Sequence, residues 1–142
     1  MPRNVKFDGK FYRDTNVEMR TLKVNYDFAR DGGAVGAIAL KNIAGDSVSL
    51  PDNAVITEVY LEGITDLASD GGATVALGYT GAATAFLGAT AKDNAKWNVD
   101  AIAALGSLPL KTDAQVSILA TIATAALTAG KFQIMIRYYE GA

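Results

Sequence analysis

Short segments of alternating apolar and polar residues run along most of this chain, and turn-forming residues separate them about every 8–12 positions. A period of two is typical of a strand with one buried face. Segments of this kind lie at 21–28, 35–40, 47–50, 54–64, 73–79, 115–123 and 132–138. We therefore predict an all-β domain of about seven or eight short strands, built as a β-sandwich or a jelly-roll-like barrel.

The alternation also predicts which side chains face the core. The predicted inner residues are Leu22, Val24, Tyr26 and Phe28; Val55, Thr57, Val59 and Leu61; Val75, Leu77 and Tyr79; and Phe132, Ile134, Ile136 and Tyr138. Residues between them, including Asn25 and Ile56, are expected on the opposite face. Segment 115–123 is apolar on both sides and fits a helix or a buried strand. Its β-branched content favours the strand.

Turn signals stand at 31–33, 51–53 and 109–113, and a hairpin-type turn is expected at 128–131. Gly78 and Gly81 mark a tight bend before 82–91, for which we expect one or two helical turns that bring Phe86 and Leu87 into the core. Segment 93–105 leaves two alternatives open. It forms either a short helix capped by Asp93 and carrying Trp97, Ile102 and Leu105, or a loop and a strand around Trp97.

The composition excludes several kinds of chemistry. A chain of 142 residues is long enough for one domain with its own core. It contains no His and no Cys, so a Ser-His-Asp triad, a His-based zinc site and a disulfide scaffold are impossible. No apolar window approaches the roughly 18–20 residues that span a bilayer, and the N-terminus resembles no secretion signal. We expect no membrane partner and no cofactor.

The remaining candidates for chemistry are carboxylates and one glycine turn. Glu58 and Glu62 share a strand face, but about 13 Å separates them, and a glycosidase pair needs about 5–9.5 Å. Loop oxygens of Asp46, Asp66 and Asp70 could bind calcium, although their spacing is not that of an EF-hand. Residues 78–81 lack the Lys-Ser/Thr of a phosphate-binding loop. We therefore predict no catalytic residue, no metal ligand and no enzyme activity.

Residues 1–20 have no clean period and are expected to form an extended N-terminal arm before the β-sandwich domain at 21–142. Residues 1–30 carry a charge of +3 and residues 31–142 a charge of −5. The candidate partner-binding residues of the arm are Arg3, Lys6, Phe7, Lys10, Phe11, Tyr12 and Arg13. Aromatic residues and arginine dominate protein interfaces, whereas Asp8, Asp14 and Glu18 dilute the positive charge. We expect a protein partner and not nucleic acid.

Two blocks of the sequence are similar to those of a known family. They are residues 55–91, with DGGATVALGYTG followed by AFLGAT, and residues 127–140, LTAGKFQIMIRYYE. Both resemble tailed-bacteriophage capsid decoration proteins, also called cement or head-stabilising proteins. The resemblance implies a β-sandwich or barrel that binds the major capsid protein on the capsid surface, as a homotrimer. It also implies a virion protein assembled in the host cytoplasm.

Two other interpretations remain. The same domain could belong to another phage structural component, such as a tail, head-fibre or baseplate protein. It could also be a carbohydrate-binding module, although no aromatic platform for a sugar is evident in the sequence.

Overall fold

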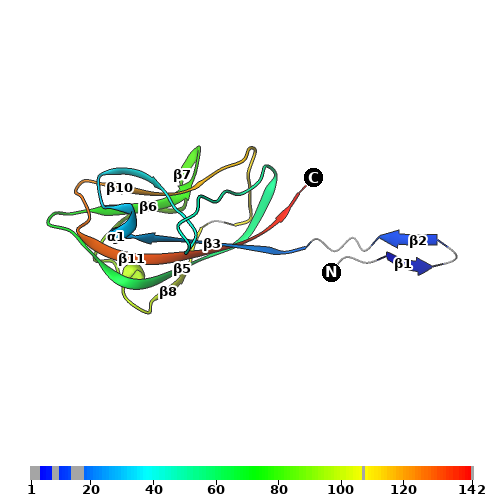
Figure 1. The fold of residues 1–142 in the computed structure, drawn as a ribbon, viewed down its shortest axis with the longest axis horizontal. Coiled ribbons are helices and arrows are strands. Elements are labelled where there is room, and N and C mark those ends of the chain that lie inside the picture. Colours follow the sequence, from blue (N-terminus) through cyan, green and yellow to red (C-terminus); the bar gives the residue numbers. More distant parts are fainter. Residues whose placement is uncertain (1–3, 8–9, 14–17, 107, 142) are drawn as a thin grey trace.

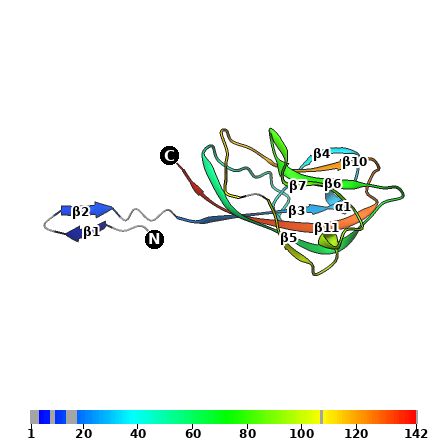
Figure 2. The ribbon, with the colours of Figure 1, turned by 180° about the vertical axis from the view of Figure 1, so that it is seen from behind.

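Two antiparallel sheets pack face to face in this protein and form a β-sandwich (Figures 1 and 2). The computed structural model describes residues 4–7, 10–13, 18–106 and 108–141. The four-stranded sheet has the order β4-β10-β6-β7, with bounds Gly36–Ala39, Ile118–Ala123, Thr74–Tyr79 and Ala82–Ala91. The prediction of an all-β sandwich is confirmed.

The five-stranded sheet has the order β3-β11-β5-β8, with bounds Arg20–Asp27, Ala129–Glu140, Ala54–Ala68 and Ile102–Ala104. Its fifth strand, β9 (Leu110–Lys111), pairs with the start of β5. A one-turn helix α1 (Phe28–Asp31) follows β3, and a 3₁₀ turn η1 (Ala95–Trp97) precedes β8. Strands β1 (Asn4–Phe7) and β2 (Lys10–Arg13) form a separate two-stranded hairpin.

The core lies between the two sheets and centres on three aromatic rings. The ring of Phe132 lies 5.3 Å from that of Tyr26 and 5.1 Å from that of Trp97, measured between centroids. All four predicted inner residues of the last strand are buried, as are Val75 and Leu77 on the opposite sheet. Strand β10 is also confirmed, with Ile118, Ala120 and Ile122 buried. These residues lie on the inner faces of strands from both sheets.

The predicted inner face of β5 is correct in its second half and wrong in its first. Val59 and Leu61 are buried, but Ile56 is buried in place of Val55 and Thr57. The cause is a bulge. The pairing with β11 passes from Glu58 opposite Arg137 to Ile56 opposite Tyr138, which leaves Thr57 without a partner. One extra residue in a strand inverts the alternation beyond it.

The helical turns predicted for 82–91 are wrong, because this segment is the edge strand β7. A tight turn at Thr80 and Gly81, where Gly81 has a φ of 88°, sends the chain back along β6. Pairing with β6 then outweighs the helical propensity of the alanines. Phe86 is buried as predicted, and Leu87 is partly buried against the core.

The end of β3 differs from prediction in two ways. Phe28 starts α1 and does not continue the strand, because the Asp27 carboxylate accepts a hydrogen bond from the Ala29 N–H at 3.1 Å and caps the turn. Asn25 is buried, with 4% of its surface exposed, although its strand position predicted solvent. Its N–H donates to the Lys41 carbonyl at 2.8 Å, so the segment after β4 covers it.

The predictions for segments 93–105 and 128–131 also need correction. In 93–105 the capping residue is Asn94 and not Asp93, and the strand is β8, around Ile102 rather than Trp97. Trp97 and Leu105 are buried, but Ile102 is 72% exposed. Residues 129–131 of the expected hairpin turn belong to the start of β11, where Gly130 occupies an irregularity in the pairing with β5.

Gly63 of β5 provides a test of this packing. Its N–H donates to the Ala101 carbonyl and its carbonyl accepts from the Asp100 N–H, both at 2.9 Å. A β-carbon at this position would overlap the carbonyl oxygen of Asn98. We expect Gly63→Ala to lower the free energy of unfolding by about 1–3 kcal/mol, measured by urea denaturation.

Gly88→Ala is the matched control, because no atom lies within 4 Å of a β-carbon built there. We expect a change within about 0.5 kcal/mol. Equal effects of the two substitutions would contradict the described packing of segment 95–101 on β5.

Candidate binding surfaces

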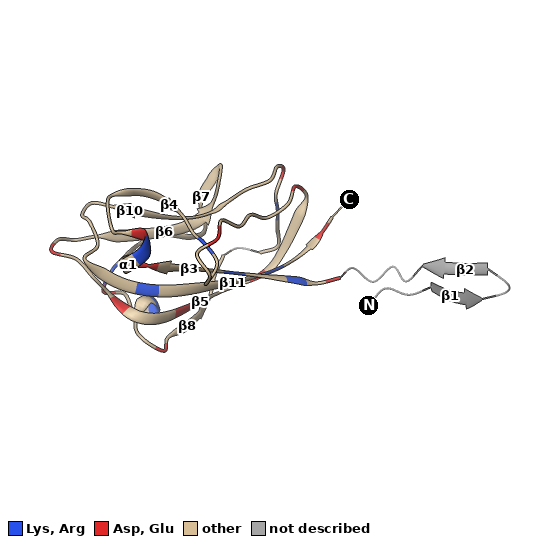
Figure 3. Cartoon of the chain, viewed as in Figure 1, with Lys and Arg blue, Asp and Glu red and all other residues tan. Residues whose placement is uncertain are grey.

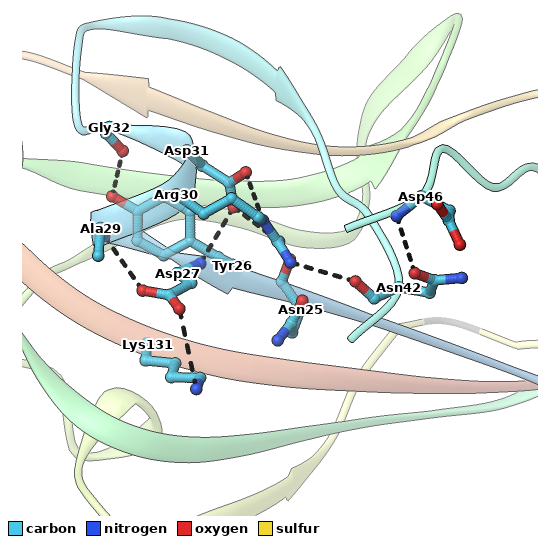
Figure 4. Close-up of polar contacts among 10 residues, drawn as sticks. All are labelled: Asn25, Tyr26, Asp27, Ala29, Arg30, Asp31, Gly32, Asn42, Asp46 and Lys131. Carbon is cyan, nitrogen blue, oxygen red and sulfur yellow. Dashed lines mark hydrogen bonds and ion pairs between the residues drawn. The ribbon is translucent and has the colours of Figure 1, made fainter. Parts of the chain in front are cut away.

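The densest polar cluster surrounds α1, and Arg30 lies at its centre (Figure 4). The Arg30 guanidinium donates from Nε and Nη2 to the two carboxylate oxygens of Asp31, each at 2.9 Å. It also donates to the carbonyls of Asn25 at 2.8 Å and Asn42 at 3.1 Å. Arg30 therefore joins α1 both to β3 and to the turn after β4.

The Asp31 carboxylate is held in its charged form. Only 2% of its side-chain surface is exposed. Burial raises its pKa, but the hydrogen bonds from Arg30 and the Asp27 N–H and the charges of Arg30 and Lys41 outweigh burial, so the net pKa is lowered. The hydrogen bond to Asp31 likewise raises the pKa of Arg30.

The Tyr26 hydroxyl belongs to the same cluster and is kept neutral. It donates to the Gly32 carbonyl at 2.6 Å. Burial, with the negative charges of Asp31 and Asp27, raises the pKa of Tyr26 to about 12. The raised pKa of Tyr26 keeps its hydroxyl neutral, and the lowered pKa of Asp31 and the raised pKa of Arg30 keep that pair ionised near neutrality. The cluster therefore connects α1 to β3 and to the turn after β4.

The carboxylates considered from the sequence lie apart on the surface. Glu58 pairs with Arg137 at 3.6 Å, and both side chains are more than 40% exposed. Glu62 is exposed on the same strand. One oxygen of Asp66 accepts from the Val99 N–H at 2.8 Å. In the part of the chain that the structure describes, no three His, Cys, Asp or Glu side chains gather to hold a metal.

The outer face of the five-stranded sheet presents an apolar groove with a charged rim. A groove of about 430 Å³ is lined by Lys23, Tyr60, Glu62, Ile102, Gln133 and Met135. A second groove of about 250 Å³ shares Lys23 and Gln133 with the first and extends to Ile43, which is 83% exposed. Exposed apolar side chains beside such grooves are typical of a surface that contacts another protein.

No sequence pattern predicted this surface, because Ile43 and Ile102 come from segments far apart in the chain. Nor did any pattern predict the Arg30–Asp31 cluster, whose partners belong to β3 and to the turn after β4. An Asp before Phe-Ala-Arg is a helix-start signal, and it could have predicted α1.

Residues of the predicted arm form the hairpin β1–β2, in which Phe7 lies opposite Lys10 and Val5 opposite Tyr12. The irregular sequence pattern did not predict this pairing. Arg3 and the side chains of Lys6, Phe7, Lys10, Phe11, Tyr12 and Arg13 lie outside the described part of the structure. Their role in partner binding stays a prediction.

Two solved structures share this fold over nearly its whole length. One is a chain of the acidic stable capsid structure of Helicobacter pylori bacteriophage KHP30, with a TM-score of 0.62 and 16% identity. The match covers 100% of this chain and 95% of that one. The other is a chain of the cyanophage Pam1 capsid asymmetric unit, with a TM-score of 0.62, 21% identity, and coverage of 90% and 89%.

At sequence identities this low, the two matches establish a shared fold alone. No family model and no curated protein matches the sequence. Among the described residues, no helix is long and apolar enough to cross a membrane.

The Arg30–Asp31 pair predicts a pH-dependent stability. Because the pKa of Asp31 is lower in the folded state than its ordinary 3.8, its charge stabilises the fold above about pH 4, and this stability is lost as the pH falls through the folded pKa. We expect Asp31→Asn to lower the free energy of unfolding by about 1.5–3 kcal/mol at pH 7. The difference from wild type should shrink between pH 5 and pH 2, measured by urea denaturation.

Asp70→Asn is the matched control, since Asp70 is exposed in the loop between β5 and β6. It should change the unfolding free energy by no more than about 0.5 kcal/mol. A difference between wild type and Asp31→Asn that stays constant from pH 7 to pH 2 would show that the Asp31 charge does not stabilise the fold.

Proposed function

We propose that this chain is a structural virion protein that binds the outer surface of a phage capsid as a trimer and stabilises the capsid lattice. The observation that carries the proposal is the end-to-end match of the fold to chains of two phage capsid structures. The match extends over 95% of one neighbouring chain and is not confined to a short segment of it. A decoration role also agrees with the resemblance of residues 55–91 and 127–140 to decoration proteins.

The described surfaces support a binding function over a catalytic one. Their most distinctive features are apolar side chains and grooves on a sheet face, and the one dense ionic cluster serves the fold. A protein that binds the assembled lattice, and not its separated subunits, stabilises the lattice by mass action. No chemical step is needed for this function.

The N-terminal arm is proposed to reach the major capsid protein. Phe7, Phe11 and Tyr12 act as apolar anchors, while Arg3, Lys6, Lys10 and Arg13 steer the arm towards an acidic surface. The excess positive charge of residues 1–30 over an acidic remainder supports this direction of attraction.

Capsid binding is tested with capsids of the source phage prepared without this protein. We expect the purified chain to co-sediment with these capsids and to raise the temperature at which they break open, measured by light scattering and dye access to the packaged DNA. Unassembled capsid subunits are the control and should not be bound. Gold-labelled protein found on tails or fibres, or specific binding on a glycan array without capsid binding, would contradict the proposal.

The role of the arm in capsid binding is tested with two variants, one that removes its aromatic side chains and one that removes its basic side chains. We expect the triple variant Phe7→Ala, Phe11→Ala, Tyr12→Ala to weaken capsid binding at least tenfold, mainly through faster dissociation. The variant Lys6→Ala, Lys10→Ala, Arg13→Ala should mainly slow association and reduce its salt dependence.

Lys92→Ala with Lys96→Ala removes positive charge from the sandwich and is the control for charge alone. Unchanged binding by both arm variants, with urea unfolding of the sandwich also unchanged, would refute the assignment of binding to the arm.

A further inference from the structure

The two sheets differ sharply in charge. Strands β4, β6, β7 and β10 contain no Asp, Glu, Lys or Arg at any position. The strands of the five-stranded sheet contain ten such residues, of both signs. Figure 3 shows the difference, because the strands of the four-stranded sheet are tan throughout. The outward side of a half-buried antiparallel sheet normally carries charged or polar residues, since water solvates it.

The outward side of this sheet follows from its alternation. Ile118, Ala120 and Ile122 of β10 are buried in the core, as are Val75 and Leu77 of β6. The intervening residues therefore point away from the core. Cross-strand pairing puts them in two rows, Ala39–Leu119–Gly78 and Ala37–Thr121–Ala76. Ala76 and Gly78 are themselves buried, and Ala82 and Ala83 of β7 lie against Gly78. We call the remaining surface, which consists of Ala37, Ala39, Leu119 and Thr121, the uncharged face.

Part of the uncharged face is open in the single chain. Ala37 and Ala39 are exposed on the edge strand β4, and Leu119 and Thr121 beside them are half-buried. Val35, just before β4, is 59% exposed. Nothing in the described part of the chain covers Ala37 and Ala39, so this apolar surface meets water unless another molecule covers it.

The edge of the same sheet gives a second, independent observation. Strand β7 runs for ten residues along the open side of β6 without a charged residue or a proline. The first charged residue, Lys92, comes only after the strand ends. Lysines, prolines and inward charges are the usual devices that keep an exposed edge strand from pairing with another chain. Strand β7 has none of these three devices, although its pairing with β6 contains two irregularities, and bulges also protect edges. Its uncharged sequence leaves this edge suited to contact with protein.

We propose that the uncharged face packs against the same face of other copies of this chain and is the contact that holds the trimer together. The inference rests on the proposed function for the trimer and adds which surface forms it. In this arrangement each copy turns the four-stranded sheet towards the three-fold axis.

The charge and size of the side chains on the uncharged face indicate which surface covers it. A covering surface that carried charges would lose their hydration against alanine and leucine and gain no ionic partner. Of the two sheet faces that the structure describes, the uncharged face is the one without a charge, so a second copy of it is the matching surface. Its small side chains let the sheets of three copies approach one another closely around the three-fold axis.

The same arrangement leaves the other sheet outward. Its exposed Lys23, Glu58, Glu62 and Arg137 are compatible with water. The grooves beside Ile43 and Ile102 then stay accessible to a different partner.

The test measures the mass of the full-length protein by multi-angle light scattering over a range of concentrations. For the wild type we expect three times the protomer mass of 14.8 kDa. Ala39→Glu and Ala37→Glu put a carboxylate at exposed positions of β4, where the single chain tolerates it. We expect each to shift the mass to 14.8 kDa or to weaken association at least tenfold, with an unchanged thermal unfolding of the dilute protomer.

Gln133→Glu is the matched control, because it puts the same charge on the outward face of β11, the central strand of the other sheet. It should leave the trimer intact. Trimers that form equally well with Ala39→Glu and Ala37→Glu would overturn the inference and leave the proposed function standing. A wild type that stays at 14.8 kDa at every concentration would overturn both the inference and the proposed trimer. Dissociation by Gln133→Glu alone would assign the contact to the five-stranded sheet and also overturn the inference.

Discussion

The position of β11 between β3 and β5 is the constraint on which the rest of this sandwich depends. The strand pairs with β3 along one side and with β5 along the other. The last strand of the sandwich therefore lies beside its first strand, β3. Its inner side places Phe132 between Tyr26 and Trp97. A slip of one residue in either pairing would turn Phe132, Ile134 and Ile136 towards solvent. The register of β11 therefore fixes the core, and through Tyr26 it also fixes α1 and the Arg30 cluster.

The sequence correctly predicted the buried face of those strands in which one side packs against the opposite sheet along the whole length. In β11 and β10 buried and partly exposed residues alternate, so the period of two in the sequence matches burial in the structure. The predictions failed where a long-range contact altered the local pattern. The bulge at Thr57 inverts β5, the segment after β4 covers Asn25, and β6 pairs the alanine-rich 82–91 as a strand. None of these contacts has a signature within a short window of residues.

The surfaces were harder to predict than the strands, for the same physical reason. The sequence excluded His and Cys chemistry correctly as a matter of composition, and it showed the charge asymmetry between the N-terminal region and the remainder. It could not show that β4, β6, β7 and β10 come together as one sheet without charges, because these segments are separated along the chain by charged ones. The identity of 16–21% to the two matched chains shows that very different sequences form this arrangement of strands.

The two proposed contacts, the uncharged face between copies and the arm towards the capsid, act together in a physical sense. A single arm with three aromatic anchors buries little surface and binds weakly alone. Three arms joined through a trimer convert the second and third contacts into intramolecular events at a high effective concentration, so modest single contacts give a stable attachment. The gain arises only where the capsid presents three equivalent positions at the right spacing. The separated capsid subunits present one, so trimerisation itself would make binding selective for the assembled lattice, and that selectivity is what stabilises the lattice.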